Sequence, residues 1–180
     1  MGYAGGKKSS PTYHSLGDHT ESIEIEFDPG QVSYEDLLKV FWAGHAPVRR
    51  AYSRQYASLI LYHNDEQRKL AVASKAREEE RRKAKLYTEI APAGTFWPAE
   101  DYHQKYYLRS QRELLREFQA IYPKEAGFVA STAVARVNGY ISGSGTAAQL
   151  EAELPRLGLS PQGQKRLLEL VRRLPSPTCR

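Results

Sequence analysis

A chain of 180 residues, of which 41% are hydrophobic and 11% aromatic, is long and apolar enough for one ordinary domain with a small appendage. Its 26 Lys and Arg residues outnumber its 21 Asp and Glu residues, which gives a net charge of +5, and both signs are spread along the chain. This composition excludes disorder throughout. It favours a mildly basic soluble protein over a nucleic-acid-binding domain.

The single cysteine, Cys179, excludes an internal disulfide framework and a cysteine-rich zinc site. No spacing brings the five histidines together as ligands, so we expect neither a metal nor another cofactor. No apolar run approaches the roughly 20 residues of a membrane-spanning helix, and the first residues lack the apolar core of a signal peptide. We therefore expect a protein of the cytoplasm or the mitochondrial matrix, without a membrane partner.

Residues 2–21 form a stretch whose loops are set by glycine and proline. Adjacent glycines, Gly5 and Gly6, predict a tight loop after a short extended segment. The stretch ends by presenting Tyr13 and Glu21, a phenol and a carboxyl that can hydrogen-bond to a polar oxygen of a substrate and protonate it. Loop residues of these types more often cap, pack or face solvent, and the residues alone leave both interpretations open.

The middle of the chain predicts alternating strands and helices. Residues 22–27 alternate apolar with polar side chains, which is the period of a half-buried strand. Ser33, with Asp36 in the first turn, can cap a helix whose apolar face continues to Gly44. The elements expected next are a buried strand at residues 56–62, a long solvated helix at 65–85 and a short strand at 86–90.

The rest of the chain predicts helices, with a change of character near Pro123. A loop that carries Trp97 leads into a helical pattern that continues to Pro123. Beyond a Ser/Gly stretch we expect two short helices and a loose tail, at residues 146–157, 160–174 and 175–180. We therefore predict a domain of residues 1–122 and a carboxy-terminal extension of residues 123–180.

Six stretches share the order and nearly the spacing of one family's motifs. They are GYAGG at residues 2–6, PTY at 11–13, HTESIEIEFDP at 19–29, SYEDLLKVFWAGHAP at 33–47, RQYASLILYHNDEQ at 54–67 and WPAEDYHQKYYL at 97–108. Through them the chain resembles the peptide methionine sulfoxide reductase A family from residue 2 to about residue 122. The tail after Pro123 lies outside this resemblance.

The resemblance implies a mixed α/β (α+β) fold. In such a two-layer sandwich, helices pack on a ferredoxin-like mixed sheet, here with the amino-terminal strand and helix missing and a small helical extension added at the carboxyl end. It also implies a peptide-methionine (S)-S-oxide reductase, which repairs methionine-S-sulfoxide in proteins with thioredoxin as reductant. The implied partners are oxidised protein or peptide methionine and thioredoxin.

The family's pocket residues correspond by motif to Tyr13, Glu21 and Tyr56. The resemblance implies that Glu21 is the acid that protonates the sulfoxide oxygen, beside the phenols of Tyr13 and Tyr56. Trp97 is expected either to line the pocket or to belong to the ordinary core. A cysteine thiolate then attacks the sulfur, methionine leaves, and the resulting sulfenic acid is reduced by a resolving thiol and thioredoxin.

The family carries its nucleophilic cysteine in a G-C-F-W segment upstream of the GYAGG loop, and this sequence begins with Met1 just downstream of that point. By position Cys179 resembles a resolving cysteine on a carboxy-terminal tail, with an incidental thiol as the alternative. We therefore expect a chain that keeps the pocket's acid and phenols, lacks the nucleophile, and is inactive alone. The alternative is a non-catalytic binding module for oxidised methionine or a protein partner.

Overall fold

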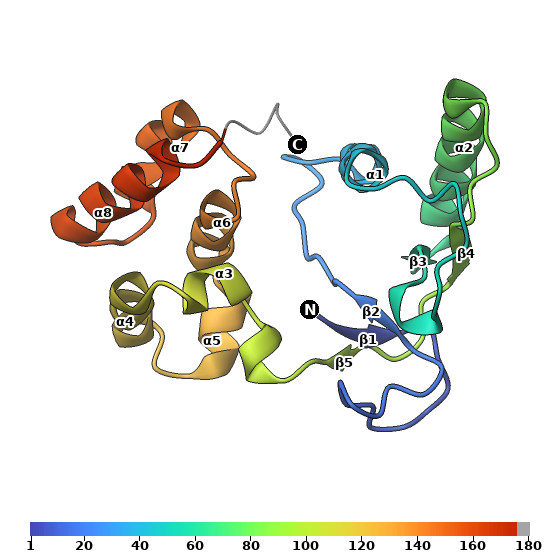
Figure 1. Cartoon of the computed structure of the whole chain (residues 1–180), viewed down its shortest axis with the longest axis horizontal. Coiled ribbons are helices and arrows are strands. Elements are labelled where there is room, and N and C mark those ends of the chain that lie inside the picture. The colour runs from blue at the N-terminus through green and yellow to red at the C-terminus, as the bar shows by residue number, and fades with distance from the viewer. Residues whose placement is uncertain (176–180) are drawn as a thin grey trace. The chain divides into compact units, whose positions relative to one another are not determined.

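The computed structural model describes residues 1–175 of the chain. The chain divides into two compact units, Met1–Glu100 and Asp101–Arg180. Within the described residues every strand belongs to the first unit, whereas the second unit is built from helices (Figure 1). The mixed α/β class predicted from the sequence is therefore confirmed.

The first unit begins with the central strand of a three-stranded sheet. Strand β1 (Gly2–Ala4) pairs antiparallel with β2 (Thr20–Ser22) on one side and with β5 (Trp97–Pro98) on the other. All three residues of β1 are buried. A Cβ atom on Gly2 would lie 2.3 Å from the carbonyl oxygen of Trp97, so the close approach of β5 requires glycine at this position.

The second sheet of this unit is a parallel pair, β3 (Leu59–Tyr62) and β4 (Glu89–Pro92). Parallel neighbours need a long crossover, and helix α2 (Asp65–Arg82) supplies it. Helix α1 (Tyr34–Ala43) packs against α2. The two helices and the parallel pair share one apolar core, formed by Leu38, Trp42, Ile60, Ala71 and Leu86.

Helix α1 begins where the sequence predicts. The Ser33 hydroxyl accepts a hydrogen bond from the backbone N–H of Asp36 at 3.1 Å, and the Asp36 carboxylate accepts one from the backbone N–H of Ser33 at 3.3 Å. This reciprocal pair satisfies two of the backbone donors that a helix start leaves free. The helix ends at Gly44, also as predicted.

Two sequence-based expectations about strands are corrected by the structure. The strand expected at residues 22–27 stops at Ser22, and residues 23–33 contain neither helix nor strand. Ile23 and Ile25 are 72% and 50% exposed, because no described strand lies against the apolar side of this alternating segment. The strands also divide between an antiparallel and a parallel sheet instead of forming one mixed sheet.

The second unit packs short helices around a core of its own. The described helices are η2 (Asp101–His103), α3 (Tyr106–Arg109), α4 (Arg112–Ile121), α5 (Glu125–Ala130), α6 (Thr132–Ile141), α7 (Ala147–Glu153), η3 (Leu154–Arg156) and α8 (Pro161–Arg172). The fully buried members of their core include Leu108, Leu114, Phe118, Val134, Leu150 and Leu167. Since α4, α6 and α8 share this core, residues on both sides of position 122 pack together.

The last two predicted helices are confirmed as α7 and α8, and Pro161 occupies the first turn of α8 as expected. Helices α5 and α6 were not predicted. The helical pattern expected up to Pro123 is interrupted, since Lys105 adopts a left-handed backbone with φ of 53° between η2 and α3. The division into residues 1–122 and 123–180 remains a prediction.

The buried hydrogen bond between α1 and α2 gives a test of the first unit's stability. The indole Nε1–H of Trp42 donates to Ser74 Oγ at 3.0 Å, and both side chains are buried. Replacing Ser74 by alanine leaves the indole N–H without this acceptor, so we expect Ser74→Ala to lower the free energy of unfolding by about 1–3 kcal/mol. Urea unfolding followed by tryptophan fluorescence measures this unit, because both tryptophans of the sequence lie in it.

The control is Ser9→Ala at an exposed position, for which a change within about 0.5 kcal/mol is expected. Equal unfolding midpoints for the two variants would contradict a stabilising role of the Trp42–Ser74 bond.

Candidate functional site

The glycine pair after β1 is held tightly by the chain around it. Gly5 has φ of +78°, a left-handed conformation that glycine adopts without strain. A Cβ on Gly6 would lie 2.6 Å from the Asp18 carboxylate and 2.7 Å from the backbone N of His19. The tight loop predicted at this position is therefore present, and it is closed by the segment that precedes β2.

His19 and Asp18 bind this loop through its backbone. The His19 ring is buried, accepts a hydrogen bond at Nδ1 from the N–H of Gly6 at 3.2 Å, and donates one from Nε2 to the carbonyl oxygen of Lys8 at 2.7 Å. The Asp18 carboxylate accepts from the N–H groups of Lys7 and Lys8 at 2.9 and 3.2 Å. These backbone donors lower the pKa of Asp18 below its ordinary value.

Arg54 joins this loop region to the second sheet. Its guanidinium donates to the carbonyl oxygens of Gly5 at 3.3 Å and Asp18 at 3.2 Å, and it forms an ion pair with Glu89 of β4 at 2.6 Å. The Thr20 hydroxyl donates to the carbonyl oxygen of Arg54 itself at 2.9 Å. The contacts hold the short 3₁₀ helix η1 (Arg54–Tyr56) beside β2, and η1 replaces the start of the strand expected at residue 56.

The position of η1 brings the expected site residues together. Its middle residue, Gln55, donates from Nε2 to Oε1 of Glu21 at 2.6 Å. The next residue, Tyr56, forms a hydrogen bond with Tyr13 that is the main reason its pKa rises to about 12. Burial and a hydrogen bond with Tyr52 raise this pKa further, and the Tyr52 and Tyr56 rings lie 5.2 Å apart.

Glu100 fixes the backbone at Tyr13. Its carboxylate accepts from the N–H of Tyr13 at 3.0 Å and from the phenol of Tyr3 at 2.5 Å. Because Tyr3 is almost fully buried in the central strand, this carboxylate ties the Tyr13 loop to the sheet. Glu100 and Gln55 were missed by the sequence reasoning, although both lie inside motifs that carry the family resemblance.

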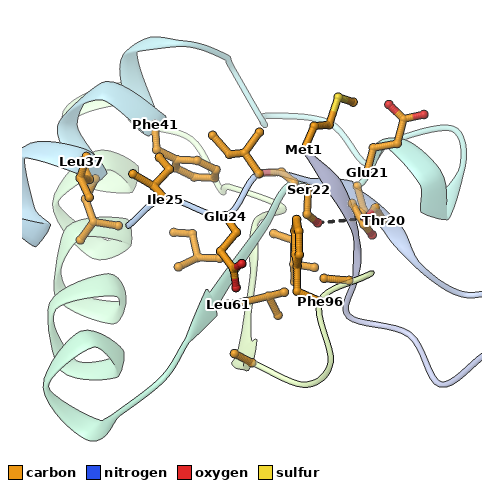
Figure 2. A pocket seen from close by; sticks show the side chains of 18 of the residues that line it. Met1, Thr20, Glu21, Ser22, Glu24, Ile25, Leu37, Phe41, Leu61 and Phe96 are labelled. Carbon is orange, nitrogen blue, oxygen red and sulfur yellow. Dashed lines mark hydrogen bonds between the residues drawn. The ribbon is translucent and has the colours of Figure 1, made fainter. Parts of the chain in front are cut away.

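A groove of about 750 Å³ lies in the first unit. Glu21 and Tyr56 line it together with mainly apolar side chains, among them Phe41, Leu61 and Phe96. Figure 2 shows Leu37, Phe41 and Ile25 together at one side of the groove, whereas Glu21 lies at the other side beside Met1 and Thr20. A ligand in this groove can place a polar oxygen at the Glu21 carboxyl. The apolar groups attached next to that oxygen can then lie on the apolar side chains.

Trp97 does not line this groove. Its side chain packs instead on the small core of Tyr3, Leu16 and Ala99, which Tyr13 also contacts. The neighbouring residue, Phe96, contributes to the groove wall. Of the two uses expected for Trp97, the structure favours ordinary core packing.

Residues 1–175 hold no group of three or more His, Cys, Asp or Glu side chains that could bind a metal ion. Cys179 lies outside the described residues, so its distance from Glu21 is not defined by the structure. No helix in the described part of the chain is long and apolar enough to cross a membrane.

Comparison with known proteins decides the family. The sequence pattern of the peptide methionine sulfoxide reductase family matches residues 1–137. The chain belongs to this family.

Individual members of the family show the same relationship. A peptide methionine sulfoxide reductase from Drosophila melanogaster is 44% identical over 89% of this chain and 65% of its own length. Peptide methionine sulfoxide reductase A5 from rice is 39% identical over 78% of this chain and 57% of its own length. The chain therefore spans somewhat less than two thirds of these two relatives.

A solved structure supports the fold assignment. Methionine sulfoxide reductase A of Corynebacterium diphtheriae superimposes with a TM-score of 0.52 at 27% sequence identity. The superposition covers 61% of this chain and 62% of the other. The mixed α/β fold is thus shared with a reductase of this family.

The phenol pair gives a test of the site's geometry. Because the hydrogen bond with Tyr13 is the largest cause of the raised pKa of Tyr56, we expect Tyr13→Phe to lower that pKa from about 12 toward 10. Selective isotope labelling of tyrosine and a pH titration by NMR measure it directly. Tyr122→Phe, in the second unit, serves as the control and should leave the titration unchanged. A Tyr56 pKa unaffected by Tyr13→Phe would show that the phenols are apart.

Proposed function

We propose that this chain binds oxidised methionine through Glu21, Tyr13 and Tyr56, and that it carries the substrate-binding part of a peptide-methionine (S)-S-oxide reductase. The observation that carries the proposal is a groove lined by apolar side chains together with Glu21 and Tyr56, in which Tyr56 interacts with the phenol of Tyr13. A methionine sulfoxide is complementary to this arrangement, because its strongly accepting oxygen sits on a sulfur that bears two apolar groups. Membership of the family supports the same substrate.

Gln55 positions the acid in this proposal. Its amide donates to Oε1 of Glu21, which leaves Oε2 as the oxygen that carries a proton to the sulfoxide. The phenol of Tyr56 remains protonated across the physiological range, since its pKa is about 12, and its hydrogen bond with Tyr13 keeps the two phenols together. Hydrogen bonds from the carboxyl and a phenol to the sulfoxide oxygen make the sulfur more electrophilic.

The reduction itself needs a thiolate. The thiolate attacks the sulfur and takes up the oxygen as a sulfenic acid while methionine leaves; a resolving thiol then forms a disulfide and releases water, and thioredoxin reduces the disulfide. Cys179 is the single cysteine among the 180 residues, and we assign it the resolving role. The 180 residues by themselves are then proposed to bind substrate without turnover, in the cytoplasm or the mitochondrial matrix.

The second candidate is a binding module that recognises oxidised methionine or a protein partner and performs no reduction. The same groove supports this candidate, and so does the presence of a single cysteine among the 180 residues. The two candidates differ in whether the bound sulfoxide is reduced once the nucleophilic thiolate of a protein lies beside Glu21.

Calorimetry with a methionine-S-sulfoxide peptide and its unoxidised counterpart tests the binding step. We expect binding selective for the sulfoxide, and each of Tyr13→Phe and Tyr56→Phe should weaken it about 2- to 10-fold, the effect of one hydrogen bond. Glu21→Gln should also weaken binding, because the proposal makes the carboxyl the proton donor to the sulfoxide oxygen. Tyr87→Phe, at a residue that does not line the groove, is the matched control.

Equal affinity for the oxidised and unoxidised peptides would rule out the proposed substrate. Methionine formation from the sulfoxide peptide with dithiothreitol, surviving in Cys179→Ser, would rule out the proposed absence of turnover in these 180 residues.

A further inference from the structure

Two tyrosine rings lie against each other at η1. Tyr52 precedes the Ser53 N-cap and Tyr56 is the last residue of η1; their ring centroids are 5.2 Å apart, with an angle of 38° between the ring planes. The N–H of Tyr56 donates to the carbonyl oxygen of Ser53 at 3.3 Å, and this turn of the backbone brings the two side chains together. The contact is therefore formed within residues 52–56 alone.

The two phenols also meet at their polar ends. A hydrogen bond joins the side chains of Tyr52 and Tyr56. In a tyrosine the ring carbons Cε1 and Cε2 flank the carbon that carries the hydroxyl, so a hydrogen bond between two hydroxyls brings a Cε atom of one ring near a Cε atom of the other. This is the arrangement from which two phenols can be joined by a carbon–carbon bond.

Tyr52 is open to an oxidant in solution, since its side chain is 86% exposed. An oxidant that removes one electron from this phenol, with release of its proton, leaves a tyrosyl radical. The radical can pass to Tyr56 through the ring contact and the hydrogen bond, so Tyr56 does not have to meet the oxidant itself. A second oxidation of Tyr52 then gives two radicals side by side.

The coupling of these radicals balances without any group from the protein. The unpaired electron of a tyrosyl radical lies largely on the oxygen and on the Cε carbons, and the two radicals combine through one Cε of each ring. Each coupled carbon then passes its hydrogen to the oxygen of its own ring, which restores the aromatic rings. The net change is the loss of two hydrogen atoms from the protein, and hydrogen peroxide takes them up as it becomes two molecules of water.

We propose that Tyr52 and Tyr56 form an oxidative cross-linking site, which hydrogen peroxide activated by a haem peroxidase converts to dityrosine. Because the folded chain holds the two rings in contact, coupling within one molecule is favoured over coupling between molecules. Rings joined directly by a carbon–carbon bond lie slightly closer than 5.2 Å, so the loop needs only a small adjustment. The inference goes beyond the binding of oxidised methionine, because it concerns a covalent change of the protein itself.

The cross-link also alters the candidate site, and this part of the inference rests on the proposed function. In the structure the phenol of Tyr56 is hydrogen-bonded with both Tyr13 and Tyr52. In dityrosine the two hydroxyls flank the new bond and hydrogen-bond to each other, so Tyr52 competes with Tyr13 for the phenol of Tyr56. Peroxide would in this way weaken the affinity of the chain for oxidised methionine.

The test treats the 180-residue chain, at high dilution, with hydrogen peroxide and a haem peroxidase, and isolates the monomer afterwards. Trypsin cleaves after Arg50, Arg54 and Arg68, so the two tyrosines fall in separate peptides, residues 51–54 and 55–68. We expect the monomer to show the blue fluorescence of dityrosine. Mass spectrometry should find these two peptides joined, with the loss of two hydrogen atoms. Dityrosine formed from N-acetyltyrosine in a parallel reaction shows that the oxidant is active.

Protein variants assign the cross-link. Tyr52→Phe should remove the joined peptides and most of the fluorescence, because phenylalanine forms no phenoxyl radical. Tyr56→Phe should do the same, which excludes coupling to Tyr62 in the same tryptic peptide. Tyr102→Phe, at an exposed tyrosine of the second unit, is the matched control and should keep both signals. Tyr13→Phe should keep them as well, since Tyr13 takes no part in the new bond.

The cross-linked monomer should bind the methionine-S-sulfoxide peptide about 2- to 10-fold more weakly than the untreated chain, the effect of one hydrogen bond, whereas treatment of Tyr52→Phe should leave its affinity unchanged. A treated monomer without dityrosine, or dityrosine that persists in Tyr52→Phe, would overturn the cross-linking site. A cross-linked monomer of unchanged affinity would overturn its effect on binding. The cross-link is identified by mass even if the untreated chain binds no sulfoxide peptide, so failure of the proposed function is distinguishable from failure of this inference.

Discussion

The guanidinium of Arg54 holds together the parts of the first unit that meet at the candidate site. It binds the carbonyl oxygens of Gly5 and Asp18 and reaches Glu89 in the other sheet. The ion pair is solvent-exposed and contributes at most about 1 kcal/mol. The bonds to carbonyl groups have the larger structural effect, because they fix η1 against the loops around β1 and β2. Without that placement Gln55 would not reach Glu21, and Tyr56 would not reach Tyr13.

Much of this unit was predictable from local sequence. The cap at Ser33, the glycine loop at Gly5 and the crossover helix α2 each follow from residues adjacent in the chain. The site residues Tyr13, Glu21 and Tyr56 were predicted from family motifs. In the structure Tyr56 interacts with Tyr13, and Glu21 is bonded to Gln55, but the role of the three residues remains a prediction. Their supporting contacts to Gln55 and Glu100 were not predicted, since they join segments 34 and 87 residues apart.

The errors in the strand predictions have a common physical cause. An apolar/polar period of two predicts that a segment forms a strand with one buried face. The pattern does not show which other segment pairs with that strand. Residues 22–27 have the pattern, and β2 nevertheless ends at Ser22 because nothing in the described chain pairs with the residues that follow.

The core of the second unit has a consequence for any shortened form of this protein. The family match ends at residue 137, inside α6, yet α4 buries Leu114 and Phe118 completely in a core that also contains Leu150 and Leu167 from the last helices. A product that stopped near the end of the family match would present those large side chains to water. Cellular quality control recognises such surfaces, so the final helices would govern how long the polypeptide persists even though the candidate site lies in the first unit.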